Sequence, residues 1–282
     1  MAIRFEDIKP KIGSRVVWDD RKDLFTPEAA EAIRRKVEER TVIVFPKLNL
    51  TDEEQLQITD LMGGKVKLTG QFNRQENDDN VYQVTLDRKI NPQPEYVLGT
   101  YFYHMDGMPV EMPPPFATLL SARKVAQKGG QTEFASTYAG FEGLPEEERK
   151  ELEKLTVIHS VKASMIPIHD AIPEEDYERV IGIQRERERP LVFTHADGHK
   201  SMLLGTTADR VVGMSIPESR ALLIRLVEWC AQPEYSLRHD WEEGDFVIWE
   251  NTSALHRAIP YDFDSGRMMH RTSIAGTEAV PA

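Results

Sequence analysis

The chain is built around the stretch Tyr101-Phe102-Tyr103-His104-Met105-Asp106-Gly107, in which an imidazole and a carboxylate stand two residues apart. We predict a short strand here. Because successive side chains on a strand point to opposite faces, His104 and Asp106 are expected on one face, where they offer a nitrogen and an oxygen to a single metal ion. On a regular strand Thr100 and Phe102 share the face of His104, so both are expected to line a substrate pocket.

Outward from this stretch, short runs of β-branched and aromatic residues alternate with turn residues. The predicted strands are Thr41–Phe45, Val81–Leu86, Phe116–Val125, Gln131–Ser136, Thr156–Val161, Leu191–His195, Ser201–Leu204, Tyr235–His239, Asp245–Glu250 and Arg267–Ala275. Helices are predicted over 26–40, from a Thr51/Glu54 capping box to Gly63-Gly64, over 145–155 and over 217–231.

Many short strands with a few helices are typical of a double-sheet jelly roll. We therefore predict a mainly β fold, with a double-stranded β-helix (jelly roll, cupin-like) core and peripheral helices, in a single domain over residues 1–282. The opening helix-strand-helix segment is expected to pack outside this core. Residues 165–190 have no clear periodicity of apolar residues and are expected to form an excursion of the chain inserted between the predicted strands. A barrel of this kind can hold one small ligand or metal in its mouth.

Composition excludes several classes of protein. The formal charge of −12, with no cluster of basic residues free of acids, argues against nucleic acid as a partner. No apolar run approaches the ~20 residues of a membrane span. The start of the chain lacks the layout of a secretory signal. Cys230 is the single cysteine, which excludes an internal disulfide framework and makes the cytoplasm the expected compartment.

His256 is the candidate for a second imidazole ligand. It follows the predicted strand 245–250 and a turn, a suitable place to aim a side chain into a barrel mouth. Two histidines and one carboxylate, with open positions left, form the ligand set of non-haem Fe(II) oxygenases. His256 is far from His104 in sequence, so only the fold can bring the two together.

Two arginines on the last predicted strand point to bound anions. Arg267 and Arg271 are four residues apart and so share a face, while His270 points the other way. Buried guanidinium groups are costly unless anions meet them, and arginine suits carboxylates and sulfonates. This pattern predicts two anionic groups in the pocket, one from a dicarboxylate cosubstrate and one from the substrate. From physics alone, ion pairs with Asp or Glu of neighbouring strands remain the alternative.

Taken together, four motifs resemble the taurine dioxygenase family, which includes the 2,4-dichlorophenoxyacetate dioxygenase and the alkylsulfatase dioxygenases. They are His104-Met105-Asp106, Gly129-Gly130-Gln131-Thr132-Glu133-Phe134-Ala135-Ser136, Trp249-Glu250-Asn251 leading to His256, and Arg267-Met268-Met269-His270-Arg271. The resemblance keeps the same order from about Thr41 to Gly276.

The resemblance implies roles for individual residues. The iron ligands it implies are His104, Asp106 and His256. Arg267 and Thr132 resemble the pair that binds the distal carboxylate of 2-oxoglutarate, and Arg271 resembles the arginine that contacts the substrate's anionic group. There are departures from the family pattern. Tyr103 stands where tryptophan is common, and 65–69 lacks the histidine of the taurine enzyme. Taurine is therefore not the expected substrate, and Lys65 or Lys67 could pair with another acid.

The implied function is an Fe(II)- and 2-oxoglutarate-dependent dioxygenase. With O2 as the second cosubstrate, it would hydroxylate a small organic anion, in some cases cleaving it, and release succinate and CO2. We expect a homo-oligomer, a dimer or tetramer, with an anionic small molecule as its partner and neither nucleic acid nor membrane. Residues 65–80 are either a lid or an ordinary surface loop.

Two other classes of function remain open. One is a zinc or manganese hydrolase or isomerase that uses the same triad without 2-oxoglutarate, which would leave Thr132 and Arg267 without a role. The other is a non-catalytic small-molecule binder, against which the intact triad counts.

Overall fold

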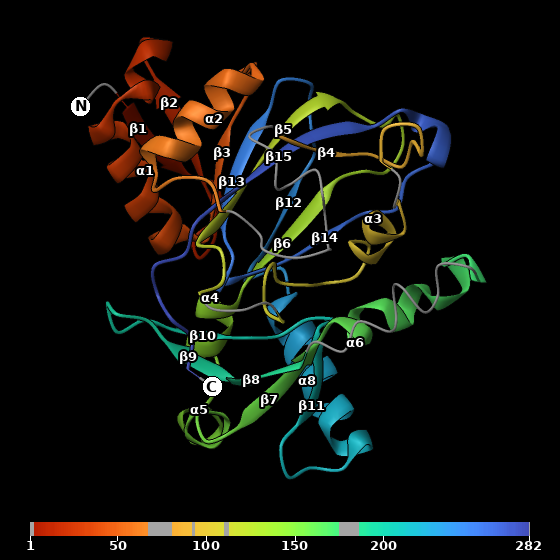
Figure 1. The fold of residues 1–282 in the computed structure, drawn as a ribbon. Coiled ribbons are helices and arrows are strands. Elements are labelled where there is room, and N and C mark those ends of the chain that lie inside the picture. Colours follow the sequence, from red (N-terminus) through yellow and green to blue (C-terminus); the bar gives the residue numbers. More distant parts are fainter. Residues whose placement is uncertain (1–2, 67–80, 92–93, 110–112, 175–185, 282) are drawn as a thin grey trace.

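Two facing sheets form the centre of the molecule (Figure 1). The computed structural model describes residues 3–66, 81–91, 94–109, 113–174 and 186–281. In spatial order, the larger sheet contains β1 (Ile3–Asp7), β2 (Ser14–Trp18), β3 (Val42–Phe45), β13 (Phe246–Glu250), β5 (Ala117–Lys124), β15 (Met268–Ile274) and β4 (Tyr82–Val84). The smaller contains β12 (Ser236–His239), β6 (Thr132–Ser136) and β14 (Ala254–Ala258). All pairs are antiparallel except β2 with β3.

The central strands β3 and β13 are buried on both faces because their side chains alternate between two cores. Phe45 and Phe246 pack with the helices on the outer face of the larger sheet. Val44 and Val247 pack on the inner face with Phe134 of the smaller sheet. This alternation explains why β3 and the first four residues of β13, before Glu250, are unbroken apolar runs. The prediction that the opening segment lies outside the core is wrong for its strand, since β3 is an internal strand.

Helices α1 (Pro27–Arg40) and α2 (Asp52–Leu61) cover the outer face of the larger sheet (Figure 1, red and orange). Both begin as predicted. The Thr26 hydroxyl accepts a hydrogen bond from the Ala29 N–H, and Thr51 and Glu54 form a reciprocal capping box. These caps satisfy backbone donors that the first helical turn leaves free.

We expect Thr51→Ala to destabilise the protein by about 1 kcal/mol, because the Glu54 N–H would lose its acceptor. Chemical denaturation followed by circular dichroism measures the difference. Gln57→Ala, at an exposed position in the same helix, is the matched control and should change stability by less than about 0.5 kcal/mol. Equal effects of the two substitutions would contradict the role of the cap.

A third layer lies below the two sheets in Figure 1. It contains the sheet β11 (Ala208–Val211), β7 (Thr156–Ser160) and β8 (Glu186–Pro190), and the hairpin β9 (Val192–Thr194) and β10 (Lys200–Met202). The remaining helices are η1 (Arg21–Phe25), α3 (Glu95–Gly99), α4 (Thr137–Glu142), α5 (Glu146–Leu152), α6 (Val161–Met165), η3 (Ile166–Ala171), α8 (Ile216–Cys230) and η4 (Phe263–Ser265). Leu226 of α8 and Phe141 of α4 share one core with Val157 of β7.

The ten predicted strands outside the opening stretch all have counterparts, but other predictions need correction. Residues 101–107 do not form a strand: His104 makes a single isolated bridge, and the residues around it are irregular, bends or turns. The region 165–190 contains η3 and β8, so it is not an irregular excursion throughout. The proposed lid falls largely on residues 67–80, outside the described residues. No helix in the described ranges has the length and apolarity needed to span a membrane.

Candidate metal centre

Three side chains from two distant segments of the chain converge between the two sheets. The Nε2 atom of His104 lies 3.9 Å from Oδ1 of Asp106, and the Nε2 atom of His256 lies 3.7 Å from Oδ2 of the same carboxylate. Their ligand atoms all lie within 4.8 Å of one another. Within the described ranges, no other group of three or more His, Cys, Asp or Glu side chains converges in this way.

Main-chain hydrogen bonds hold the two histidines together. The N–H of His104 donates to the carbonyl of His256, and the N–H of His256 donates to the carbonyl of His104, each at 3.0 Å. Gly205 closes the arrangement from the other side: its φ is +99°, and a Cβ there would lie 2.8 Å from the Cα of His104. The His104 loop is thus fixed by tertiary contacts where the sequence predicted a regular strand.

The imidazoles are held in the tautomer that suits a metal ligand. Nδ1 of His104 lies 2.9 Å from the carbonyl of Phe102, and Nδ1 of His256 lies 3.2 Å from that of Ala254. A carbonyl can only accept, so Nδ1 carries the proton and the Nε2 lone pair faces the centre. Burial lowers the pKa of His104 and lowers that of His256 to about 3. Both rings are therefore neutral at pH 7, as metal ligation requires.

Asp106 is the ionised member of the group. Burial by itself raises the pKa of this carboxyl, but Arg271 and the two imidazoles lower it, with a net pKa well below the usual range. Nη2 of Arg271 lies 3.2 Å from Oδ2. The Thr118 hydroxyl donates to the same oxygen at 2.7 Å and also lies 3.1 Å from Oδ1 of Asn251. The donor set of two neutral imidazoles and one carboxylate fits a ferrous ion.

A cavity of about 90 Å³ adjoins the three ligands. Besides them it is lined by Val84, Thr100, Leu120, Thr132, Trp249, Ala258, Arg267 and Arg271. Most residues predicted from the sequence therefore meet at this cavity. Phe102 is the exception: its side chain is 40% exposed and absent from the lining. Its assignment rested on a shared strand face, and that strand does not exist.

Arg267 is buried without a carboxylate partner among the described residues. Its side chain is 4% exposed; Nη2 donates to the Gly130 carbonyl at 3.2 Å, and the guanidinium lies 4.8 Å from the ring centroid of Tyr261. The Thr132 hydroxyl accepts a hydrogen bond from Nε1 of Trp241 at 2.9 Å. A buried cation with no protein anion is suited to an anionic ligand. Arg271, by contrast, already pairs with Asp106.

Sequence reasoning missed three residues around the site: Thr118, Asn251 and Tyr261. Thr118 is the first polar residue of the otherwise apolar start of the predicted strand 116–125. A hydroxyl at such a position needs a hydrogen-bond partner, and this was the signal in the sequence that could have identified it. Of the two lysines proposed as cations for a substrate, Lys65 forms a bridge with Ile274, and Lys67 lies outside the described residues.

Comparison with known proteins shows which family this chain resembles. Residues 4–273 match the family model described as taurine catabolism dioxygenase TauD, TfdA family. The chain is 32% identical over 288 residues to the alpha-ketoglutarate-dependent 2,4-dichlorophenoxyacetate dioxygenase of Cupriavidus pinatubonensis (97% of this chain, 98% of the relative). It is 30% identical over 256 residues to the (S)-phenoxypropionate/alpha-ketoglutarate-dioxygenase of Sphingobium herbicidovorans (86% and 84%). Among solved structures, AAD-2 in complex with Mn(II) and N-oxalylglycine superposes with a TM-score of 0.83 and 28% identity over 100% of both chains.

Proposed function

Because the chain belongs to the TauD, TfdA family of dioxygenases, we propose that it is an Fe(II)- and 2-oxoglutarate-dependent dioxygenase that hydroxylates a small organic anion. The observation that carries this proposal is the convergence of His104, Asp106 and His256 beside a cavity that is also lined by Arg267. This arginine is buried and has no acidic partner in the part of the chain that the structure describes. A zinc or manganese hydrolase needs no such arginine.

In this proposal His104, Asp106 and His256 hold the iron. Bound iron supplies the activation of O2 and the oxidative decarboxylation of 2-oxoglutarate to succinate and CO2. The Arg267 guanidinium binds the distal carboxylate of 2-oxoglutarate, with the Thr132 hydroxyl beside it. The apolar side chains Val84, Leu120 and Trp249 exclude water from the rest of the cavity. The positive charge of Arg271 keeps Asp106 ionised and attracts the substrate's anionic group.

The structural part of the proposal is a jelly-roll core, formed by the two facing sheets, in one domain over residues 1–282. Facing antiparallel sheets with the candidate site between them support it. Relatives acting on 2,4-dichlorophenoxyacetate and (S)-phenoxypropionate make aryloxyalkanoates the first substrates to test, ahead of sulfonates and sulfate esters. A homo-oligomeric state and a cytoplasmic location stay predictions from the sequence.

The direct test is an anaerobic titration with Fe(II) and 2-oxoglutarate, read by the visible metal-to-ligand charge-transfer band, followed by a panel of small acids in air. We expect the band to form and succinate to appear in a substrate-dependent way. Turnover of an acid under strict anaerobiosis without 2-oxoglutarate would instead favour the metal-dependent hydrolase or isomerase.

Thr118→Val should weaken metal binding by about 10- to 100-fold, because Asp106 would lose a hydrogen bond that orients its carboxylate. Competition with a chelating dye measures the metal affinity. Thr272→Val is the matched control: it lies on the adjacent strand β15, and its hydroxyl contacts Thr59 instead of the site. Unchanged affinity in Thr118→Val would show that Asp106 needs no such support.

A further inference from the structure

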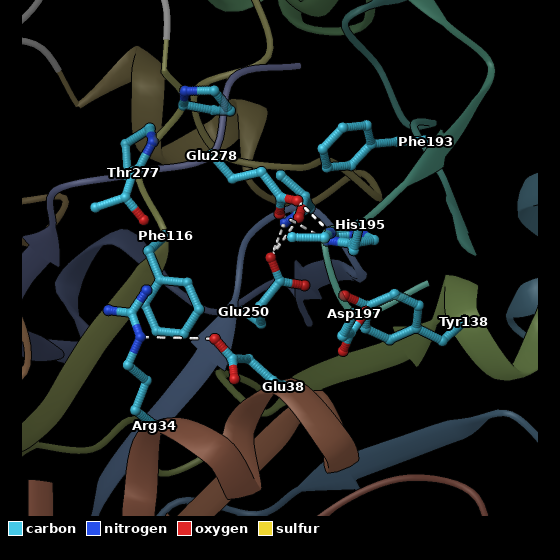
Figure 2. Close-up of a pocket in the computed structure, with 15 residues that line it drawn as sticks. Arg34, Glu38, Phe116, Tyr138, Phe193, His195, Asp197, Glu250, Thr277 and Glu278 are labelled. Carbon is cyan, nitrogen blue, oxygen red and sulfur yellow. Dashed lines mark hydrogen bonds and ion pairs between the residues drawn. The ribbon is translucent and has the colours of Figure 1, made fainter. Parts of the chain in front are cut away.

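A second cavity of about 200 Å³ shares no lining residue with the metal cavity. Helix α1, the end of β13, the β9–β10 hairpin and the C-terminal segment enclose it (Figure 2). Its lining contains four carboxylates, from Glu38, Asp197, Glu250 and Glu278. Neither the metal centre nor the reaction proposed above uses any of them.

Three of these carboxylates each have one basic neighbour. The pairs are Glu38 with Arg34 at 3.6 Å, Asp197 with His199 at 3.0 Å and Glu278 with His195 at 3.1 Å. The Arg34 guanidinium is already engaged, since it lies over the ring of Phe116 and donates to the Met62 carbonyl. The three basic side chains can therefore neutralise at most these three acids.

Glu250 is the carboxylate left over. Its side chain is only 3% exposed. Oε1 accepts hydrogen bonds from the N–H and the hydroxyl of Thr252. Oε2 is enclosed and has no hydrogen-bond partner, and no Lys, Arg or His among the described residues forms an ion pair with this group. Figure 2 shows the carboxylate between Glu38 and Asp197. Burying an unpaired carboxylate costs several kcal/mol, so a cation in the cavity would be strongly favoured.

Neighbouring groups respond to the same negative potential. Burial, followed by the charges of Glu250 and Asp197, raises the pKa of the Tyr138 hydroxyl. Burial also raises the pKa of Glu38, against the effect of Arg34, and Glu250 adds to the rise. The aromatic rings of Tyr138, Phe116 and Phe193 line the cavity beside the acids. Carboxylates beside aromatic side chains form a typical environment for an organic ammonium ion.

We propose that this cavity binds a small organic cation, an ammonium group on a short alkyl chain, with the Glu250 carboxylate as its principal acceptor. An alkylammonium ion fits better than a single metal ion, because the four carboxylates do not come close enough to form a common ligand set. The N–H donors of an ammonium group can instead reach carboxylates on different elements, while its methylene groups contact the rings. This inference does not depend on the proposed dioxygenase activity.

Calorimetry tests the proposal with 1,4-diaminobutane as the probe. The full-length protein is titrated in the presence of saturating Mn(II) and 2-oxoglutarate, and variants of the cavity carboxylates distinguish binding there from binding at the metal centre. We expect saturable binding at one site per chain, with no heat from the uncharged analogue 1,4-butanediol. Glu250→Gln keeps an acceptor for Thr252 but removes the charge, and should weaken binding at least about tenfold.

Glu38→Gln provides a second variant at a less buried position and should also weaken binding. Its matched control is Glu31→Gln: Glu31 is on the same helix, pairs with Arg35 at the same 3.6 Å and lies outside the cavity. Binding in Glu31→Gln should be unchanged. Absence of saturable binding, or equal affinity in the wild type and both cavity variants, would overturn the proposal. So would one-site binding of Mg²⁺ that is lost in Glu250→Gln when the amine itself does not bind.

Discussion

His256→Ala is expected to abolish the charge-transfer band of the anaerobic Fe(II) and 2-oxoglutarate complex, together with substrate-dependent succinate formation. The variant removes one of three proposed ligands. It leaves Asp106 beside a single imidazole, that of His104, with Arg271 as its cationic partner. Asp106→Ala and His104→Ala should behave in the same way, because each leaves only two protein ligands. Absorbance titration under argon and a succinate assay in air measure the two effects.

His169→Ala is the matched control for these ligand variants. His169 is an exposed histidine whose ring contacts Asp170, and it is not one of the residues that line the cavity. Its variant should form the band at the wild-type Fe(II) concentration. A band retained in both Asp106→Ala and His256→Ala would show that the metal binds elsewhere, whatever the activity of the variants.

Arg267→Ala should raise the KM for 2-oxoglutarate by about 100- to 1000-fold, with a smaller change in kcat. Its guanidinium is buried and has no acidic partner among the described residues. In the variant, the distal carboxylate of bound 2-oxoglutarate would therefore be buried without a cation. A 100- to 1000-fold change corresponds to about 2.8–4.2 kcal/mol, near the lower part of the about 3–5 kcal/mol that breaking one side of a buried ion pair costs. Steady-state assays at varied 2-oxoglutarate concentration measure KM and kcat separately.

Arg267→Lys should recover part of the affinity, because an ammonium group keeps the charge but loses the paired N–H donors. Arg238→Ala is the control, since Arg238 is a half-exposed arginine on β12 whose nearest carboxylates are 3.9 Å away. An unchanged KM for 2-oxoglutarate in Arg267→Ala would refute the proposed role, even if the iron ligands are correct.

Much of the fold follows from local signals in the sequence. The Thr51/Glu54 capping box and the apolar run at 42–45 predict their elements because neighbouring residues alone determine them. Strands β1, β2, β8, β11 and β14 were not predicted. In β8 the cause is charge, since Glu186–Pro190 pairs with β7 despite its alternating acids and arginines. In an edge strand such as β8, pairing with the sheet overrides the weak preference of the residues.

The residues of the candidate site could be predicted from the sequence, but their arrangement in space could not. Residue types and order were enough to select the three ligands and the two arginines that meet at the cavity. The predicted strand around His104 is wrong because tertiary bonds to β14, absent from any local pattern, determine that backbone. The pairing of Arg271 with Asp106 was equally hidden, since it depends on how the two segments meet.

The exchange of backbone hydrogen bonds between His104 and His256 bears on how this protein can change over evolutionary time. Amide and carbonyl groups are the same in every residue except proline, which lacks the N–H, so mutations nearby leave this connection intact. Exposed positions such as Phe102, whose side chain lies outside the cavity lining, can therefore change without breaking this connection. Gly205 is the exception, since any larger residue there would press on the backbone of His104.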